Sequence, residues 1–532
     1  MIQCDYLELP DGRLIHYRHV GQGPVILMLH PSPQSSETLV PIMEVFAPVA
    51  HCVAIDTPGY GLSDPLPDTP TNLDPYADVV LAVADRLGLE RVHVYGAATG
   101  GQIAIALARN YPDRVASLLL DSIGHFPEGE QAKMLDGYFP ETAPRRDGGH
   151  LLTYWEMVRH LYRAFPWQSL ATEDQLAVDT PNPALMQTLV MRYLQAGEGY
   201  STAYRVAFAA EKHEYLERVT VPGTLMRWQG SLVGRYTDTL INMGLPETIR
   251  VIAAGVPGAE RYAMQRDAFV EMSRDDAAFE PVTTADVTST QRCYFGAGDR
   301  QIHGRWVGAP AADASIVLHD IGESSRIAAG RWAELAPHQT ALCVDLPGHG
   351  ASAAPADLTT LETYVDALAD ALARSPYEQP HCYGFGFSGA IALALAERGL
   401  VSATTLIDPI PILRGEAQDW IAWAQPDLKP TPDGGHLIRA WHAVREATRY
   451  WPWFDSSANA LREMPTTTEM LDWHSCTVDL LGAMRVAPRL RHLEAHFDWG
   501  QAFARANDAS EVRYTDRHPD PDRLTAFGAR PW

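Results

Sequence analysis

The fold is decided by one stretch of the chain, Val92-His93-Val94-Tyr95-Gly96-Ala97-Ala98-Thr99-Gly100-Gly101-Gln102-Ile103-Ala104. Its first half has the composition of a buried β-strand, its glycines mark a sharp turn, and its second half is typical of a closely packed helix of small residues. A strand that turns this tightly into a helix lifts one residue to the edge of an α/β sheet. The stretch therefore predicts such a sheet, with Ala98 at the lifted position.

The glycine frame of this turn is that of a nucleophile elbow, Gly-x-Ser-x-Gly, in which a serine occupies the lifted position. Here that position is Ala98, whose methyl group cannot attack a substrate. The motif thus predicts the fold and leaves out the chemistry that usually accompanies it.

Composition and charge exclude several classes of function. The 532 residues suggest more than one domain, and a hydrophobic content of 46% is enough for large buried cores. The net charge of −24 repels phosphate backbones and anionic membranes, so we expect neither a nucleic-acid nor a membrane partner.

The N-terminus shows no basic region followed by an apolar run, and no stretch reaches the roughly 18 apolar residues of a membrane span. The 6 cysteines are scattered without paired spacing, which favours free thiols over disulfides or a metal site. These features predict a protein of the reducing cytoplasm.

Apolar runs at 25–29, 52–55, 92–97 and 115–120 alternate with helical patterns. This order predicts a doubly wound parallel sheet with right-handed crossovers.

The second half of the chain repeats the motifs of the first at a nearly constant offset. His30 matches His319, Asp-x-Pro-Gly-x-Gly occurs at 56–61 and 345–350, and the elbow recurs at 384–389. We therefore expect two copies of one fold, 1–285 and 286–532, joined by a Pro- and Thr-rich segment around 280–289. We expect a helical lid insertion in each copy, at about 125–218 and about 411–500, and a second copy that lacks the last strand or two.

These motifs resemble the α/β-hydrolase superfamily over nearly the whole chain. The resemblance implies two tandem α/β-hydrolase-like domains and an active pocket beneath each lid, usually without a cofactor. It also implies a Ser-Asp-His triad, which the chain does not match. The elbow positions are Ala98 and Gly386, the acid position falls in 228–231 without a carboxylate, and the histidine position falls on Glu260 or Arg261.

The chain offers two alternative explanations for the missing nucleophile. Ser388 lies two residues beyond the elbow position, where a small residue also lets helix and strand approach. A replacement of a catalytic residue by Ala98 would leave the missing acid and histidine unexplained.

Anion recognition can survive without a nucleophile. The resemblance implies an oxyanion hole formed by the N–H of Thr99 and an N–H after the third strand, where Ser32 follows His30 and Pro31. We therefore expect His30, Ser32, Ala98 and Thr99 to bind substrate, with His319, Gly386 and Phe387 as the equivalents of the second copy.

The longest internal match lies in the two lids, where Asp-Gly-Gly-His begins a helical pattern at 147–150 and 433–436. One interpretation makes His150 a general base over the pocket, with Arg159 holding an anion and Trp155 and Trp167 forming an apolar wall. The equivalents are His436, Trp441 and Arg445. The alternative is that both motifs dock and cap the lids.

Asp121 and His125 follow the sixth strand and are further candidates for proton transfer. No motif indicates a metal or nucleotide cofactor. We therefore expect either an enzyme acting on a small carbonyl- or carboxylate-bearing molecule, as a hydrolase or lyase without a serine nucleophile, or a catalytically inactive binding or scaffold protein. A third hypothesis makes the second copy a structural partner of the first, and a homodimer is left open.

Overall fold

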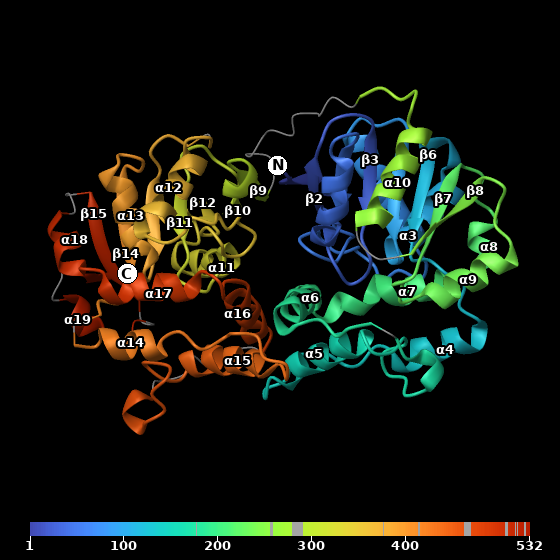
Figure 1. The fold of residues 1–532 in the computed structure, drawn as a ribbon. Helices are drawn as coiled ribbons and strands as arrows, with labels where there is room; N and C mark the ends of the chain where they lie inside the picture. Colours follow the sequence, from blue (N-terminus) through green and yellow to red (C-terminus); the bar gives the residue numbers. More distant parts are fainter. Residues whose placement is uncertain are drawn as a thin grey trace. The chain divides into compact units, whose positions relative to one another are not determined.

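The computed structural model describes residues 1–176, 178–255, 259–278, 291–375, 377–412, 415–461, 470–505, 509–515, 518, 520–525 and 528–532. The chain divides into two units, Met1–Ala143 with His150–Thr284 and Pro144–Gly149 with Ala285–Trp532. Each unit contains an eight-stranded sheet with helices (Figure 1). The two α/β sheets predicted from the repeated motifs are confirmed.

The first sheet has the strand order β1-β2-β4-β3-β5-β6-β7-β8. The N-terminal hairpin forms an antiparallel edge, since β1 pairs with β2 and β2 with β4 in antiparallel register. The other neighbours are parallel. The strands are β1 (Gln3–Glu8), β2 (Leu14–Val20), β3 (Val25–Leu29), β4 (His51–Ile55), β5 (Val92–Ala97), β6 (Val115–Asp121), β7 (Gly223–Trp228) and β8 (Ile249–Ala254).

The helices of the first unit fall into a sheet-covering group and a lid. The lid runs between β6 and β7 and gathers at one end of the sheet (Figure 1). The sheet-covering helices are α1 (Val40–Phe46), α2 (Asp74–Arg86), α3 (Thr99–Asn110), α9 (Gly234–Met243) and α10 (Ala259–Met272). The lid helices are α4 (Glu128–Gly137), α5 (Gly149–Leu161), α6 (Pro183–Ala196), α7 (Thr202–Ala210) and α8 (His213–Leu216).

Alternate side chains of β3 enter two different cores, one on each face of the sheet. Leu27 and Leu29 pack with apolar residues of α2 and α3. Ile26 and Met28 pack with those of α1 and α10. A strand covered on both faces buries every side chain, which explains why its sequence is a continuous apolar run.

The second sheet has the order β16-β15-β14-β13-β11-β12-β10-β9, with as many strands as the first. The expectation that this copy lacks its last strands is therefore wrong. The last strand, β16 (Arg530–Pro531), is present but has only 2 residues, and it pairs in parallel with β15 (Ser510–Tyr514). The other strands are β9 (Arg292–Phe295), β10 (Ile302–Val307), β11 (Ser315–Leu318), β12 (Ala341–Val344), β13 (His381–Phe385) and β14 (Ala403–Ile407).

The second unit also has its lid between the sixth and seventh strands of its sheet, here β14 and β15. The helices that cover the sheet or follow it are α11 (Ser325–Leu335), α12 (Leu361–Leu372), α13 (Ser388–Glu397) and α19 (Pro521–Thr525). The helices of the insertion are α14 (Ala417–Trp423), α15 (Gly435–Ala447), α16 (Met470–Gly482), α17 (Ala487–His496) and α18 (Trp499–Arg505).

The aspartate of each Asp-x-Pro-Gly-x-Gly motif ties its loop to the antiparallel edge of the sheet. Asp56 is buried and lies 2.8 Å from Nδ1 of His16 on β2. Its carboxylate also accepts hydrogen bonds from the N–H groups of Ser36 at 2.6 Å and Leu62 at 2.9 Å. Burial acts to raise the pKa of Asp56, but the charge and hydrogen bond of His16 and the neighbouring Arg18 outweigh it and hold the pKa below its usual range.

The second unit repeats this arrangement. Nδ1 of His303 lies 2.8 Å from Asp345 Oδ2, which also accepts from the N–H of Ala351 at 2.9 Å. The motif therefore stabilises the loop that follows the second parallel strand of each unit, and the role of its aspartate is structural.

We expect Asp56→Asn to lower the free energy of unfolding by about 3–5 kcal/mol, because an amide cannot replace a buried carboxylate that accepts two backbone N–H groups and contacts a histidine. Because the folded-state pKa of Asp56 is depressed, this stabilisation is present above the unfolded pKa of about 4 and is lost as the pH falls through the folded-state pKa. Urea unfolding followed by circular dichroism at pH 7 measures the difference.

Asp113→Asn is the matched control, because Asp113 is exposed in the loop after α3. It should change the free energy by about 0.5 kcal/mol or less. Equal losses from the two substitutions would contradict the structural role of Asp56.

Candidate functional site

The first elbow consists of a single residue between β5 and α3. Ala98 has φ +47° and ψ −115°. The glycines beside it are required by close packing, since a Cβ on Gly96 would lie 2.4 Å from Gly100 O and a Cβ on Gly100 would lie 2.2 Å from Leu29 O. Positive φ is uncommon for a residue with a side chain, and such strain gathers at functional sites. Ala98 thus stands where an elbow places its nucleophile and presents only a methyl group.

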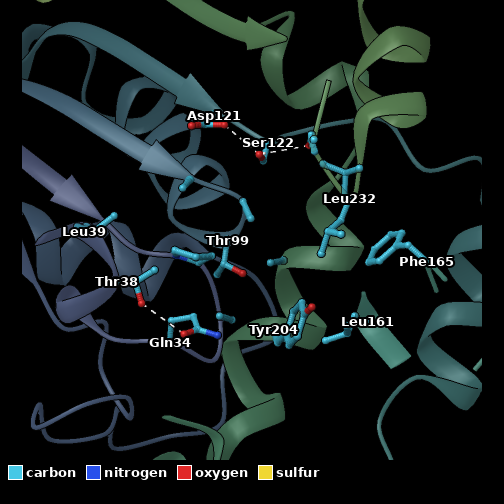
Figure 2. Close-up of a pocket in the computed structure, with 18 of the residues that line it drawn as sticks. Gln34, Thr38, Leu39, Thr99, Asp121, Ser122, Leu161, Phe165, Tyr204 and Leu232 are labelled. Carbon is cyan, nitrogen blue, oxygen red and sulfur yellow. Dashed lines mark hydrogen bonds between the residues drawn. The ribbon is translucent and has the colours of Figure 1, made fainter. Parts of the chain in front are cut away.

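A cavity of about 380 Å³ lies at this elbow, between the strand ends and the lid (Figure 2). Its base contains Ala98, Thr99 and Asp121, and the lid adds mostly apolar and aromatic side chains such as Phe165 and Tyr204. A third wall comes from the segment after β3, which includes Ser32, Gln34, Thr38 and Leu39. A cavity of this size and lining suits a small, partly apolar organic molecule.

Asp121, the last residue of β6, organises the polar end of the cavity. Its Oδ1 accepts from Trp228 Nε1 and from Ser122 Oγ, both at 2.9 Å. Its Oδ2 accepts from Tyr95 Oη at 3.2 Å and Gln265 Nε2 at 3.3 Å. Figure 2 shows Asp121 and Ser122 side by side at the end of β6. The carboxylate is therefore held in one orientation by groups from four elements.

Arg261 places a cation at the same end. Its guanidinium lies 4.1 Å from the centre of the Trp228 ring and 4.5 Å from that of Tyr262, and its Nε is 3.6 Å from Asp121 Oδ2. Burial acts to lower the pKa of Arg261, but Asp121, Tyr262 and Tyr95 together outweigh it and raise the pKa. The planar, permanently charged fork, held by two aromatic residues, is well suited to bind a carboxylate.

The N-terminus of α3 supplies an anion cradle at the base of the cavity. Thr99 is the first residue of the helix, and a backbone N–H at that position has no acceptor within the helix. Together with the helix dipole it favours a negative charge beside Ala98. Ser32 lies in the facing wall, where the resemblance places the second donor of an oxyanion hole.

Glu211 adds a buried carboxyl group where the lid returns to the sheet. It accepts from the N–H of Gly124 at 2.7 Å and from the side chain of Gln102. Burial raises the pKa of Glu211 to about 8, although both hydrogen bonds act to lower it. Near neutral pH this group can give or take a proton at little cost, as a general acid or base requires.

The structure brings four of the predicted site residues to the cavity, Ser32, Ala98, Thr99 and Asp121. His30, His125, His150, Trp155, Arg159 and Trp167 do not line it. The imidazole of His30 is buried between the carbonyl of Pro31 and the N–H of Thr57. His125 Nδ1 accepts from the N–H of His213.

The predicted lid residues serve packing instead. His150 and Trp155 are fully buried, Arg159 pairs with Glu156 at 3.3 Å, and Trp167 donates to the carbonyl of Tyr138. The geometry of α5 explains why His150 falls outside the cavity. The helix reaches the cavity with Val158 and Leu161, and eight residues of helix separate His150 from Val158 by about 12 Å.

The equivalent residues of the second unit behave in the same way. His319 bridges the carbonyl of Asp320 and the N–H of Leu346, as His30 does in the first unit. His436 and Trp441 are buried, and Arg445 pairs with Glu446. Burial lowers the pKa of His436 to about 4. Gly386 and Phe387 form the second elbow.

Sequence reasoning missed Glu211 and the roles of Arg261, Trp228 and Tyr95. Arg261 was noted only as occupying the histidine position. Glu211 belongs to Glu211-Lys212-His213, whose charged pattern indicates a solvated helix end. No local signal distinguishes it, because its burial depends on contacts with β6, α3 and the lid.

Comparison with known proteins places the chain among α/β-hydrolases. The family model described as alpha/beta hydrolase fold matches residues 24–220 and 316–452. A 2-hydroxy-6-oxononadienedioate/2-hydroxy-6-oxononatrienedioate hydrolase of Paraburkholderia phymatum is 34% identical over 111 residues, or 20% of this chain and 38% of that protein. Haloalkane dehalogenase 2 of Mycobacterium bovis is 34% identical over 122 residues, or 23% of this chain and 42% of that protein. The chain thus spans well under half the length of these relatives.

Solved structures are similar over one half of the chain. Epoxide hydrolase A from Mycobacterium thermoresistibile is 17% identical with a TM-score of 0.40, covering 53% of this chain and 100% of that one. A meta-cleavage product hydrolase from Pseudomonas fluorescens IP01 is 18% identical with a TM-score of 0.37, covering 51% and 97%.

Among the residues that the structure describes, none of the helices combines the length and the apolar character of a membrane span. In the same part of the chain, no group of three or more His, Cys, Asp or Glu side chains could hold a metal ion.

We expect Glu211→Gln to remove a pH dependence of stability. The folded-state pKa of Glu211 lies above the value of about 4.3 in an unfolded chain, so the folded protein binds the extra proton between these values. Wild type therefore loses stability as the pH rises from about 5 to 8, by up to about 1.4 kcal/mol per pH unit. Glutamine mimics the neutral acid and does not lose a proton. The free energy of unfolding of the variant, measured with urea, should therefore rise relative to that of wild type as the pH increases over this interval.

Glu214→Gln is the control, because Glu214 is exposed three residues further along. Its difference from wild type should not depend on pH. A constant difference for Glu211→Gln as well would contradict the raised pKa of Glu211.

Proposed function

Because the chain belongs to the alpha/beta hydrolase fold family, we propose that its first unit is an enzyme acting on a small carbonyl- or carboxylate-bearing molecule without a covalent serine intermediate. One observation carries this proposal. The cavity at Ala98 combines a backbone anion cradle, the guanidinium of Arg261 and the buried carboxyl group of Glu211.

Arg261 and the cradle divide the work of binding. The guanidinium takes a carboxylate of the substrate, and its contacts with the rings of Trp228 and Tyr262 hold it in place. The N–H of Thr99 receives the carbonyl oxygen and is best placed to stabilise negative charge that develops there. Asp121 acts as a positioning residue, since it fixes Trp228 and balances the charge of Arg261.

Glu211 supplies proton transfer in this proposal. As a carboxylate it accepts a proton from a water molecule or from a carbon next to the carbonyl, and as the neutral acid it returns the proton to the product. Addition of water followed by bond cleavage would make a hydrolase, and cleavage without water would make a lyase. His150 and His125 have no place in this scheme, because neither lines the cavity.

The name of one relative, the hydrolase of Paraburkholderia phymatum, agrees with this substrate class. A hydroxy-oxo-dienedioate carries a ketone and two carboxylates, which match the cradle and Arg261. We also propose that the enzyme is located in the cytoplasm and needs no cofactor.

A substrate screen tests the proposal with three variants. Wild type should turn over at least one keto acid or dicarboxylate of this kind. Glu211→Gln should lower kcat by about 100-fold or more, because the amide cannot transfer a proton. Arg261→Met should raise KM by about 10- to 100-fold, because it removes a charge-assisted hydrogen bond of about 1.5–3 kcal/mol.

Arg266→Met is the control for Arg261, because Arg266 lies on the same helix and pairs with Asp267 outside the cavity. It should leave both constants unchanged. Turnover that is equally insensitive to all three substitutions would place the chemistry elsewhere.

A binding protein without turnover is the second candidate, and the methyl group of Ala98 favours it. The same cradle and guanidinium would hold a carboxylate ligand and release it unchanged. Binding of the panel by calorimetry, with no product formed by any member, would select this candidate.

We expect Ala98→Ser to remain unlabelled by a fluorophosphonate probe. A serine needs a neighbouring base to attack, and no histidine is found among the described residues that line the cavity. A serine hydrolase of the same family serves as the positive control. Strong labelling of the variant would show that a base for a serine is present after all.

A further inference from the structure

The second elbow has a ligand that comes from the chain itself. Between β13 and α13, Gly386 has φ +55° and is followed by Phe387. The N–H of Phe387 donates to Asp320 Oδ1 at 3.0 Å, and the N–H of Ile321 donates to the same oxygen at 2.7 Å. A carboxylate therefore occupies the anion position of this elbow.

The two elbows differ at matched positions. By the register of the repeat, Asp320 corresponds to Pro31, Gly386 to Ala98 and Phe387 to Thr99. In the first unit the turn residue is a proline without a carboxylate, and the elbow residue carries a methyl group that lines an open cavity.

The space at the second elbow is taken by the carboxylate. A Cβ on Gly386 would lie 2.2 Å from Asp320 Cγ and 2.4 Å from both carboxylate oxygens. The carboxylate of Asp320 therefore requires a glycine at position 386. In the first unit no carboxylate stands at the matching position, and the methyl group of Ala98 has room.

The charges around Asp320 are of both signs. Arg491 attracts the charge of Asp320, while Glu323 and Glu494 oppose it. Both glutamates are themselves paired, Glu323 with Arg331 at 2.6 Å and Glu494 with Arg491 at 2.8 Å. Burial raises the pKa of Asp320 to about 6, so the carboxylate is mostly charged at neutral pH.

We propose that the second elbow is a carboxylate-binding site filled by Asp320, and that a small free carboxylate binds there once this side chain is removed. The second unit is accordingly a self-filled counterpart of the first, with its anion position closed to external ligands. That the first elbow receives the carboxylate or enolate of a substrate rests on the proposed function, but the filling of the second elbow does not.

Asp320→Gly tests this site directly with formate as the probe. Removing the side chain leaves the N–H of Phe387 facing a space of about the size of formate beside Gly386. Calorimetric unfolding should show a lower Tm for the variant, and sodium formate should restore about 2–4 °C more than sodium chloride at equal ionic strength. Wild type, whose second elbow is filled, sets the baseline for formate bound elsewhere, and the expected gain is the response of the variant beyond this baseline. A response of the variant no larger than that of wild type would overturn the proposal.

Two further variants complete the test. Asp313→Gly, in the exposed loop before β11, controls for added backbone freedom and should respond to formate as wild type does. Asp320→Ala empties the same space with less added backbone freedom, so it should fold even if Asp320→Gly does not, and it should show the same gain from formate. An Asp320→Ala variant that responds to formate only as wild type does would contradict a filled anion site.

The readout also separates this inference from the proposed function. Formate rescue of Asp320→Gly without any turnover by wild type would support the filled site and count against the enzyme. Turnover by wild type without formate rescue would do the reverse.

Discussion

The close approach of a helix to its sheet sets the architecture of each unit. In the first unit, α3 packs so tightly against β3 and β5 that Gly96 and Gly100 admit no side chain. A strand can enter a helix so near to it only through one residue at positive φ, which is Ala98. This constraint directs the N-terminus of α3 at the carboxyl ends of the strands, where its N–H groups have no helical partner. An anion cradle follows from packing alone, whatever residue stands at the elbow.

The two units fill this cradle differently. In the first, the cradle borders a cavity with a cation and a titratable carboxyl group beside it. In the second, Asp320 enters the cradle and Gly386 makes room for it. A shared backbone frame has therefore been given an open site in one copy and an internal carboxylate in the other. The two units differ at Asp320 and Gly386, because a side chain at Gly386 would occupy the same volume as the carboxylate of Asp320.

Residues repeated in both copies mostly serve what the copies share. His16 and His303 hold the motif aspartates, and His30 and His319 bridge neighbouring loops. His150, repeated as His436, belongs to the buried start of a lid helix. Two ionisable groups of the first cavity, Arg261 and Glu211, lie outside the repeated motifs, and their contacts come from α10, the lid and the sheet together.

The sequence by itself determined the two α/β sheets, the position of both elbows, the insertion of the lids and the absence of a nucleophilic atom at Ala98. These follow from local patterns, because apolar runs, glycine frames and turn residues act on neighbours in the chain. Only the tertiary structure decided which polar groups meet. Lid histidines and arginines that looked catalytic are packed or paired, whereas Glu211, in a charged stretch typical of a helix end, is buried against Gly124. Burial and charge pairing depend on residues distant in sequence, so the chemistry of a cavity is visible only once the chain has closed around it.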